Sequence, residues 1–257
     1  YGLGVLLGQA GENRVGPGGG ASHAAGGAER EQDVGGVLVE RDGALGRLLD
    51  GEGAAAVLQR RRPGAIGLVG RLPLISPYLV AVAAGPWHTV RTDHRGLPFG
   101  IHCRRSLAPH LDADATELLS TTTALFDRYH EKFDEPYPFD SYDQAFVPEF
   151  NAGAMENPGL VTFRDSYVFR SAVTDAERCS RAVTIAHEMA HMWFGDLVTL
   201  TWWDDIWLNE SFAEYMGYQT VAEATRWTHV WTDFAAGRKD WGYDADQRPT
   251  THPVAPD

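Results

Sequence analysis

The 257-residue sequence is poor in cysteine, in basic residues and in long apolar runs, and each shortage excludes a class of protein. Its two cysteines, Cys103 and Cys179, lack CxxC spacing, so we expect neither a disulfide framework nor a thiolate metal site, and we expect a reducing, cytoplasmic location. The 22 Lys and Arg against 35 Asp and Glu give a formal charge of −13, which argues against nucleic acid or an anionic membrane as a partner. No apolar run approaches the roughly 20 residues that a membrane-spanning helix needs.

Residues 1–70 also lack large apolar side chains. They contain 19 of the 28 glycines and, with Tyr1, one of the 28 aromatic residues. A segment with so little apolar surface cannot offset its ordering entropy by burial. We therefore expect residues 1–70 to be irregular or disordered, although short apolar runs such as residues 36–39 could pair as strands. A phosphate-binding glycine loop is not supported, because no GxxxxGK(S/T) pattern occurs.

From residue 71 the composition is that of a folded domain. Tyr78–Ala84 and Leu97–Cys103 are short apolar runs, and residues 93–96 between them have turn chemistry. Together they predict a β-hairpin. Pro98, near the start of the second run, suits an edge strand or the first residues of a strand.

Apolar residues at helical spacing predict further helices. One extends over residues 114–132 behind an aspartate cap, and a strand over residues 144–150 follows it. A second helix begins at a capping box formed by Thr174 and Glu177 and ends at Gly195. In the last two helices, around Glu210 and over residues 226–241, the large apolar residues are predicted to be core: Phe212, Tyr215, Met216, Trp227, Val230, Phe234 and Trp241.

The second of these helices carries the pattern HExxH. His187 and His191 lie four residues apart on one face, so both rings can reach one metal ion. Glu188 is turned about a quarter of the way round the helix and can act as general base toward a water at the metal. Glu210, which follows His191 after 18 intervening residues, would complete a His₂Glu set with an open fourth position, as catalytic zinc sites have. Glu214 is either an acceptor for a ligand histidine's free N–H or a solvated glutamate.

Residues 151–159, with the sequence NAGAMENPG, follow the predicted strand. Their glycine and alanine residues leave the backbone open to close approach by another chain. An ordinary Gly/Pro turn after a strand is the alternative interpretation.

Over residues 71–257 the chain resembles the zinc aminopeptidases of the aminopeptidase N type, within the gluzincin metallopeptidases. The matching phrases are GAMEN at Gly153–Asn157, HEMAHMWFGDLVT at His187–Thr199 and WLNESFAEYM at Trp207–Met216. The resemblance implies an α+β fold with a thermolysin-like zinc metallopeptidase catalytic core. We expect that core over residues 106–257, truncated at its C-terminus, after the last strands of an incomplete β-domain at residues 71–105.

The resemblance also implies a mechanism. It implies one Zn²⁺ per chain, held by His187, His191 and Glu210. Glu188 would take a proton from the attacking water and deliver it to the leaving amine. The implied substrates are peptides with a free N-terminus.

The GAMEN phrase is implied to lie on an edge strand beside the zinc. Glu156 would bind the substrate's α-ammonium group, and an ammonium anchored there lets only the first peptide bond reach the metal. Gly153 and Ala154 would offer backbone groups to an extended peptide. Met155 would line the pocket for the first side chain, and Asn157 completes the motif.

The chain departs from the family pattern in three respects. Residues 1–70 offer no counterpart of a second glutamate that binds the α-ammonium group, and neither the family's oxyanion tyrosine nor its C-terminal helical domain has a match. We therefore interpret the sequence as a fragment whose first 70 residues come from a wrong reading frame or an unrelated piece. A catalytically impaired zinc- and peptide-binding remnant remains an alternative, whereas nothing in the sequence supports the family's epoxide-hydrolysing branch. The oligomeric state stays open.

Overall fold

The computed structural model describes residues 4–7, 77–251 and 253. Within the first 70 residues, Gly4–Leu7 form strand β1, although we expected irregular structure there. The prediction for the remainder of that segment lies outside the described residues. Strand β1 pairs antiparallel with β2, Ala81–Ala84, in a two-stranded sheet.

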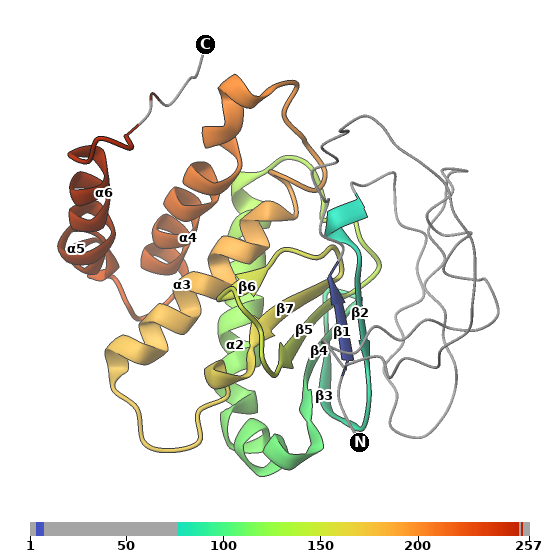
Figure 1. The fold of residues 1–257 in the computed structure, drawn as a ribbon. Helices are drawn as coiled ribbons and strands as arrows, with labels where there is room; N and C mark the ends of the chain where they lie inside the picture. The colour runs from blue at the N-terminus through green and yellow to red at the C-terminus, as the bar shows by residue number, and fades with distance from the viewer. Residues whose placement is uncertain (1–3, 8–76, 252, 254–257) are drawn as a thin grey trace, which may run out of the picture.

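A five-stranded mixed sheet in the order β3-β4-β5-β7-β6 forms the centre of the fold (Figure 1). β5 pairs in parallel with both β4 and β7, whereas the two outer pairs are antiparallel. All six residues of β5 are buried, because both faces of the sheet are covered at its middle. The strands are β3 (Trp87–His94), β4 (Leu97–Arg104), β5 (Tyr142–Val147), β6 (Ala154–Met155) and β7 (Leu160–Arg164).

The predicted hairpin exists, but its first strand was wrong. The partner of β4 is β3, and the turn between them has positive φ at both Arg95 and Gly96. A two-residue turn of this kind joins strands that are adjacent in sequence, so the earlier apolar run Tyr78–Ala84 could not be the partner. β3 was not predicted as a strand, because polar residues interrupt its apolar pattern. Pro98 is the second residue of β4 and precedes the pairing with β5, as its lack of an N–H requires.

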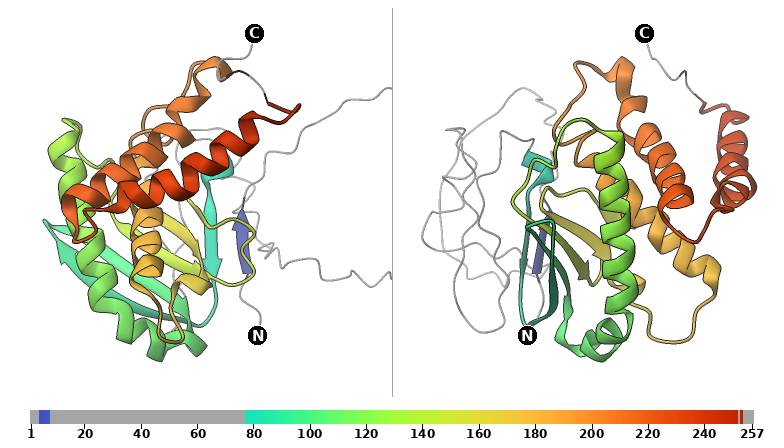
Figure 2. Two further views of the ribbon diagram at one scale, coloured as in Figure 1. Left: turned by 90° about the vertical axis from the view of Figure 1, so that its left-hand side faces the viewer. Right: turned by 180° about the vertical axis from the view of Figure 1, so that it is seen from behind.

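Helices α2, α3 and α4 lie together on one side of the sheet, and α5 and α6 lie beyond α4 (Figure 2). α2 connects the parallel strands β4 and β5, which need such a crossover. The fold is therefore α+β, as predicted. The helices are α2 (Ala108–Lys132), α3 (Asp175–His191), α4 (Glu210–Ala224), α5 (Val230–Asp233) and α6 (Lys239–Asp246), with a π-helix, Phe234–Arg238, between the last two. Short 3-10 helices span Pro77–Leu79, Arg105–Leu107, Asp165–Tyr167 and Trp203–Leu208.

Several predicted boundaries need correction. α2 begins at Ala108, with a proline in its first turn, whereas Asp114 is buried inside the helix and does not cap it. The capping box of Thr174 and Glu177 is present, but α3 ends at His191, before Gly195. β5 ends at Val147, because the chain turns there and Glu149 adopts a φ of +55°.

Two residues predicted to be core are exposed. Tyr215 on α4 is 47% exposed and Trp241 on α6 is 65% exposed. Met216, Trp227 and Val230 are buried as predicted. The difference arises because an aromatic side chain at helical spacing shows that a face is apolar, but the spacing does not show whether another element covers that face.

β3 and β4, which we expected to end a preceding β-domain, share one sheet with β5 and β7, so the sheet is continuous across residue 105. Both cysteines are buried and free, in line with the expected lack of a disulfide. None of the helices in the described part of the chain combines the length and the apolar character that crossing a bilayer requires.

Candidate metal centre

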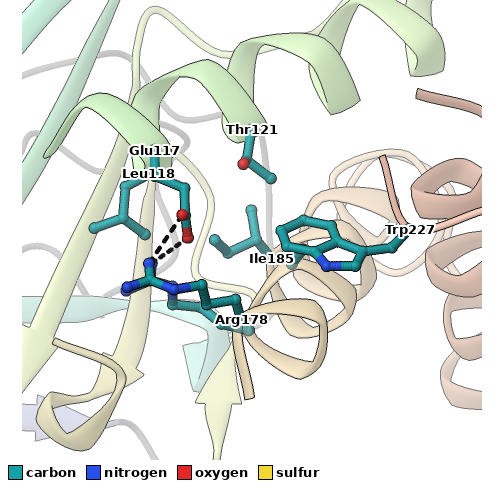
Figure 3. Close-up of a pocket in the computed structure, with 8 residues that line it drawn as sticks. Glu117, Leu118, Thr121, Arg178, Ile185 and Trp227 are labelled. Carbon is teal, nitrogen blue, oxygen red and sulfur yellow. Dashed lines mark hydrogen bonds and ion pairs between the residues drawn. The ribbon is translucent and has the colours of Figure 1, made fainter. Parts of the chain in front are cut away.

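The helix that carries HExxH is fixed to α2 by a buried arginine. Arg181, only 2% exposed, donates hydrogen bonds to Asp114 (2.7 Å) and Glu117 (2.9 Å), and its guanidinium lies 4.0 Å from the centre of the Phe169 ring. Arg178 also donates to Glu117, at 2.9 Å, across the hollow between α2 and α3 that Figure 3 shows. Removing one partner of a buried ion pair typically costs about 3–5 kcal/mol. The network therefore holds α3 in place on α2.

The third predicted ligand comes from α4, and a glycine lets α4 approach α3 closely. A Cβ at Gly217 would lie 3.2 Å from the backbone N of His187 and 3.3 Å from its Cα. Such contacts are tighter than those of ordinary side chains. Gly217 thus allows the two helices to pack closely enough for Glu210 and Glu214 to reach the histidines.

The three predicted ligands converge. Nε2 of His187 lies 3.1 Å from Nε2 of His191, and Oε2 of Glu210 lies 3.2 Å and 3.7 Å from these two nitrogens. Two nitrogens about 2.0–2.1 Å from one tetrahedral zinc ion would lie about 3.3 Å apart. The spacing and the chemistry of His187, His191 and Glu210 therefore fit a metal ion of this kind.

The second ring nitrogen of each histidine is held by an acceptor. Nδ1 of His187 donates to Oε2 of Glu214 at 2.9 Å, and Nδ1 of His191 donates to the backbone oxygen of Phe194 at 3.0 Å. A carboxylate or a carbonyl can only accept, so each Nδ1 carries a proton and each Nε2 is the nitrogen available to a metal. The contact of Glu214 agrees with the first of its two interpretations. No sequence pattern could have predicted the role of the Phe194 carbonyl, because every residue has a backbone carbonyl.

The donor set retains protons when no metal is bound. Burial disfavours the charged form of His187, but hydrogen bonds with Glu210 and Glu214 outweigh burial and raise the pKa of His187 to about 10. The hydrogen bond to His187, followed by that to His191, holds the pKa of Glu210 well below its usual range. A metal ion that binds here must therefore displace protons.

Two buried acids lie beside the ligands. Glu188 is 6% exposed, and its burial is the main reason that its pKa is raised to about 7. Asp196 is 5% exposed, and burial, then the charges of Glu156 and Glu188, raise its pKa to about 9. Neither carboxylate oxygen of Asp196 has a hydrogen-bond partner within the described part of the chain. Such a concentration of acids favours a bound cation, and a pKa near 7 suits Glu188 to general base catalysis.

The GAMEN residues form the edge of the sheet next to this centre. In β6, Ala154 and Met155 pair with Phe163 and Thr162 of β7, and no further strand of the described chain pairs with β6. β6 contacts α3, and Glu156 is buried at 5% exposure. Its charge raises the pKa values of both Glu188 and Asp196. The structure thus brings Glu156 to the metal centre.

Two polar side chains support this edge strand. The amide of Asn157 donates to the backbone oxygen of Leu79 at 3.0 Å and accepts from Thr162 at 2.8 Å, so it is occupied within the chain. The guanidinium of Arg164 donates to three consecutive backbone oxygens, those of residues 150–152, at 2.9–3.2 Å. Sequence reasoning missed Arg164, because a lone arginine at the end of a strand carries no motif. Its role is to shape the loop that leads into β6.

A His₂–carboxylate set with a buried glutamate beside it is the arrangement of a metallopeptidase centre. Comparison with known proteins agrees: the family model described as "Peptidase family M1 domain" matches residues 117–256. The chain belongs to peptidase family M1.

Curated relatives carry aminopeptidase names. The chain is 56% identical over 191 residues to "Aminopeptidase N" of Streptomyces lividans. The aligned residues make up 72% of this chain and 22% of the relative. It is 37% identical over 163 residues to "Aminopeptidase N" of Lactobacillus delbrueckii subsp. lactis, covering 62% of this chain and 19% of the relative. "Puromycin-sensitive aminopeptidase" of Caenorhabditis elegans is 35% identical over 184 residues, 71% of this chain and 19% of that protein. The chain thus spans about a fifth of the length of these relatives.

Proposed function

We propose that the protein is a zinc-dependent aminopeptidase that hydrolyses the N-terminal peptide bond of peptides. The observation that carries the proposal is the convergence of two Nε2 atoms and one carboxylate oxygen, from His187, His191 and Glu210, beside the buried Glu188. The aminopeptidase names of the relatives support it. We propose Zn²⁺ in particular, one ion per chain, because two imidazoles and one carboxylate form a common catalytic zinc set.

We also propose that this part of the chain has a thermolysin-like core. The packing of the HExxH helix and the third-ligand helix beside a small mixed sheet supports this proposal. We place the start of the catalytic unit at β3, in preference to residue 106, because β3 and β4 continue its sheet. Strand β1, Gly4–Leu7, pairs with β2 in the two-stranded sheet, outside this unit.

In the proposed mechanism the chain positions a water and moves its proton. Zn²⁺ at this site would supply a Lewis acid that polarises the scissile carbonyl and makes a water nucleophilic at neutral pH. A carboxylate oxygen of Glu188 takes the proton of the attacking water. Burial raises the pKa of Glu188 in the metal-free centre, which favours its taking up this proton, and the protonated carboxyl can then deliver the proton to the nitrogen of the leaving amine.

Exopeptidase specificity would come from the edge strand. Glu156 binds the α-ammonium group of the substrate, and its fixed distance from the metal ligands places only the first peptide bond for attack. The backbone of Gly153 and Ala154 binds the extended peptide as an added strand. Met155 lines the space for the first side chain. Asn157 holds the strand in shape through its bonds to Leu79 and Thr162.

An assay on the zinc-loaded chain tests the proposal. Release of a chromophore from an aminoacyl anilide is expected, a chelator should abolish it, and added Zn²⁺ should restore it. The matched N-acetylated anilide, which lacks the ammonium group, should be cleaved far more slowly. Stoichiometric zinc without any release would contradict the proposal and support the catalytically impaired remnant.

A further inference from the structure

The helical segment that follows α4 contains a π-helix, an element that is rare in proteins and frequent at functional sites. It packs on α4 through an aromatic cluster. The ring of Phe234 lies 5.1 Å from that of Tyr218 and 5.4 Å from that of Trp231, and Trp231 lies 5.8 Å from Tyr215. This cluster fixes the position of the π-helix relative to the helix that carries Glu210 and Glu214.

The last residue of the π-helix reaches the metal centre. Nε of Arg238 lies 2.7 Å from Oε1 of Glu214 in an ion pair, while Oε2 of the same carboxylate accepts from Nδ1 of His187 at 2.9 Å. Each oxygen of Glu214 therefore has a different partner. Within the described residues, Arg238 is the one arginine or lysine paired with Glu214.

We propose that Arg238 is a positioning residue of the metal centre: it holds Glu214 in the orientation that presents Nε2 of His187 to the metal. This inference rests on the proposed zinc function. A glutamate side chain has several rotamers of similar energy, and the ion pair selects the one in which Oε2 faces the imidazole. The ion pair also places a positive charge beside the carboxylate that accepts from Nδ1 of His187.

The exposure of Arg238 indicates that its ion pair acts on Glu214 and not on the stability of the whole fold. Arg238 is half exposed, with 52% of its side chain accessible, so the ion pair contributes little to global stability. Its effect is local, because the guanidinium lies 2.7 Å from Oε1 of Glu214 and so holds one end of the carboxylate by its charge. Loss of Arg238 should therefore change metal affinity more than it changes folding.

Zinc affinity of the full chain, measured by competition with a chromophoric zinc chelator, tests the inference without any need for turnover. Arg238→Met keeps the aliphatic stem and removes the charge, and it should weaken zinc binding about five- to tenfold, at the lower end of losses seen when a ligand's orienting partner is removed. Arg238→Lys should recover part of the loss. Arg226→Met, which breaks the ion pair of a comparably exposed arginine with Asp175, is the matched control and should bind zinc as the parent does.

A double variant shows whether Arg238 acts through Glu214. In a Glu214→Ala background, Arg238→Met should cause no further loss of zinc affinity. Unchanged affinity in Arg238→Met alone, or an equal loss in both backgrounds, would overturn the inference. If the parent chain itself fails to bind zinc, the proposed function fails instead, so the two failures can be told apart.

Discussion

The chain contains two clusters in which histidine meets carboxylate, and their differences show why one of them fits a metal ion. In the first cluster, His102 and Asp143 are both fully buried and their side chains lie 2.5 Å apart. Thr89 contacts Nδ1 of His102 at 2.9 Å, and Ser141 donates to the second oxygen of Asp143 at 2.8 Å. Gly100 closes the cluster, since a Cβ there would collide with Asp143.

The second cluster, at the metal centre, is open. The Nε2 atoms of His187 and His191 face each other at 3.1 Å, and two nitrogen lone pairs cannot form a stable contact without a proton or a cation between them. The side chain of Glu210 is 65% exposed, which gives solutes access. The same residue types therefore stabilise the fold when every polar atom has a partner, and bind a cation when their lone pairs converge on one point.

The largest effect is expected from a variant that removes the proposed general base, Glu188, and keeps the three proposed metal ligands. Glu188→Gln should lower kcat for an aminoacyl anilide by about 10²–10⁴, because general base catalysis typically contributes that much. Zinc content should stay at one per chain, which atomic absorption can measure. His102→Gln, at the closed cluster, is the control, and its kcat per folded molecule should equal that of the parent. A kcat of Glu188→Gln close to that of the parent would contradict the assignment.

A second variant separates peptide recognition from metal binding. Glu156→Ala should weaken binding of substrates with a free N-terminus by about 2–5 kcal/mol, the usual loss when one partner of a buried charge pair is removed. Zinc affinity should remain close to that of the parent. The measurement is the ratio of kcat/KM for a free and an N-acetylated substrate, which should collapse toward one. Retention of the parent's ratio would show that another group binds the ammonium.

A substitution in the closed cluster of His102 and Asp143 should lower the stability of the folded chain. Asp143→Asn should lower the free energy of unfolding by about 3–5 kcal/mol at pH 7, because it leaves His102 without its charged partner. Burial alone would raise the pKa of Asp143, but its hydrogen bond with His102 and nearby charges outweigh burial and lower that pKa.

The sign of the pH effect follows from this lowered pKa. The stabilisation by Asp143 is complete above its unfolded pKa, about 3.9, and is lost as the pH falls through its lower folded pKa. The stability difference between the parent and Asp143→Asn, measured by urea denaturation, should therefore shrink in acid. A difference that does not change with pH would contradict the sign.

The last expected effect is the pH dependence of zinc affinity. Because the pKa of His187 is about 10 in the metal-free centre, zinc must displace its proton, and apparent affinity should rise about tenfold per pH unit between pH 6.5 and 8.5. Chelator competition at several pH values measures the slope. The His102→Gln protein should show the same slope, since its histidine lies in the closed cluster. A flat profile would show that His187 carries no proton to displace.

Much of the site could be predicted from local sequence. The spacing of His187 and His191 predicted that both rings face one point, because helical geometry places residues four apart on one face, and the structure brings Glu210 to them. The capping box at Thr174 is similarly local. The predicted hairpin partner of β4 was wrong, because β3 is a partly polar strand whose identity depends on its pairing across the sheet.

The sequence by itself thus determined which residues could bind a metal and which helix carries them, since both depend on contacts over a few residues. Only the tertiary structure decided that Glu214 and Phe194 orient the two imidazoles, that Gly217 lets α4 approach α3, and that Arg238 reaches Glu214 from the π-helix. Those contacts join residues from separate elements. The packing of helices and sheet, which no short pattern records, brings them within hydrogen-bonding distance.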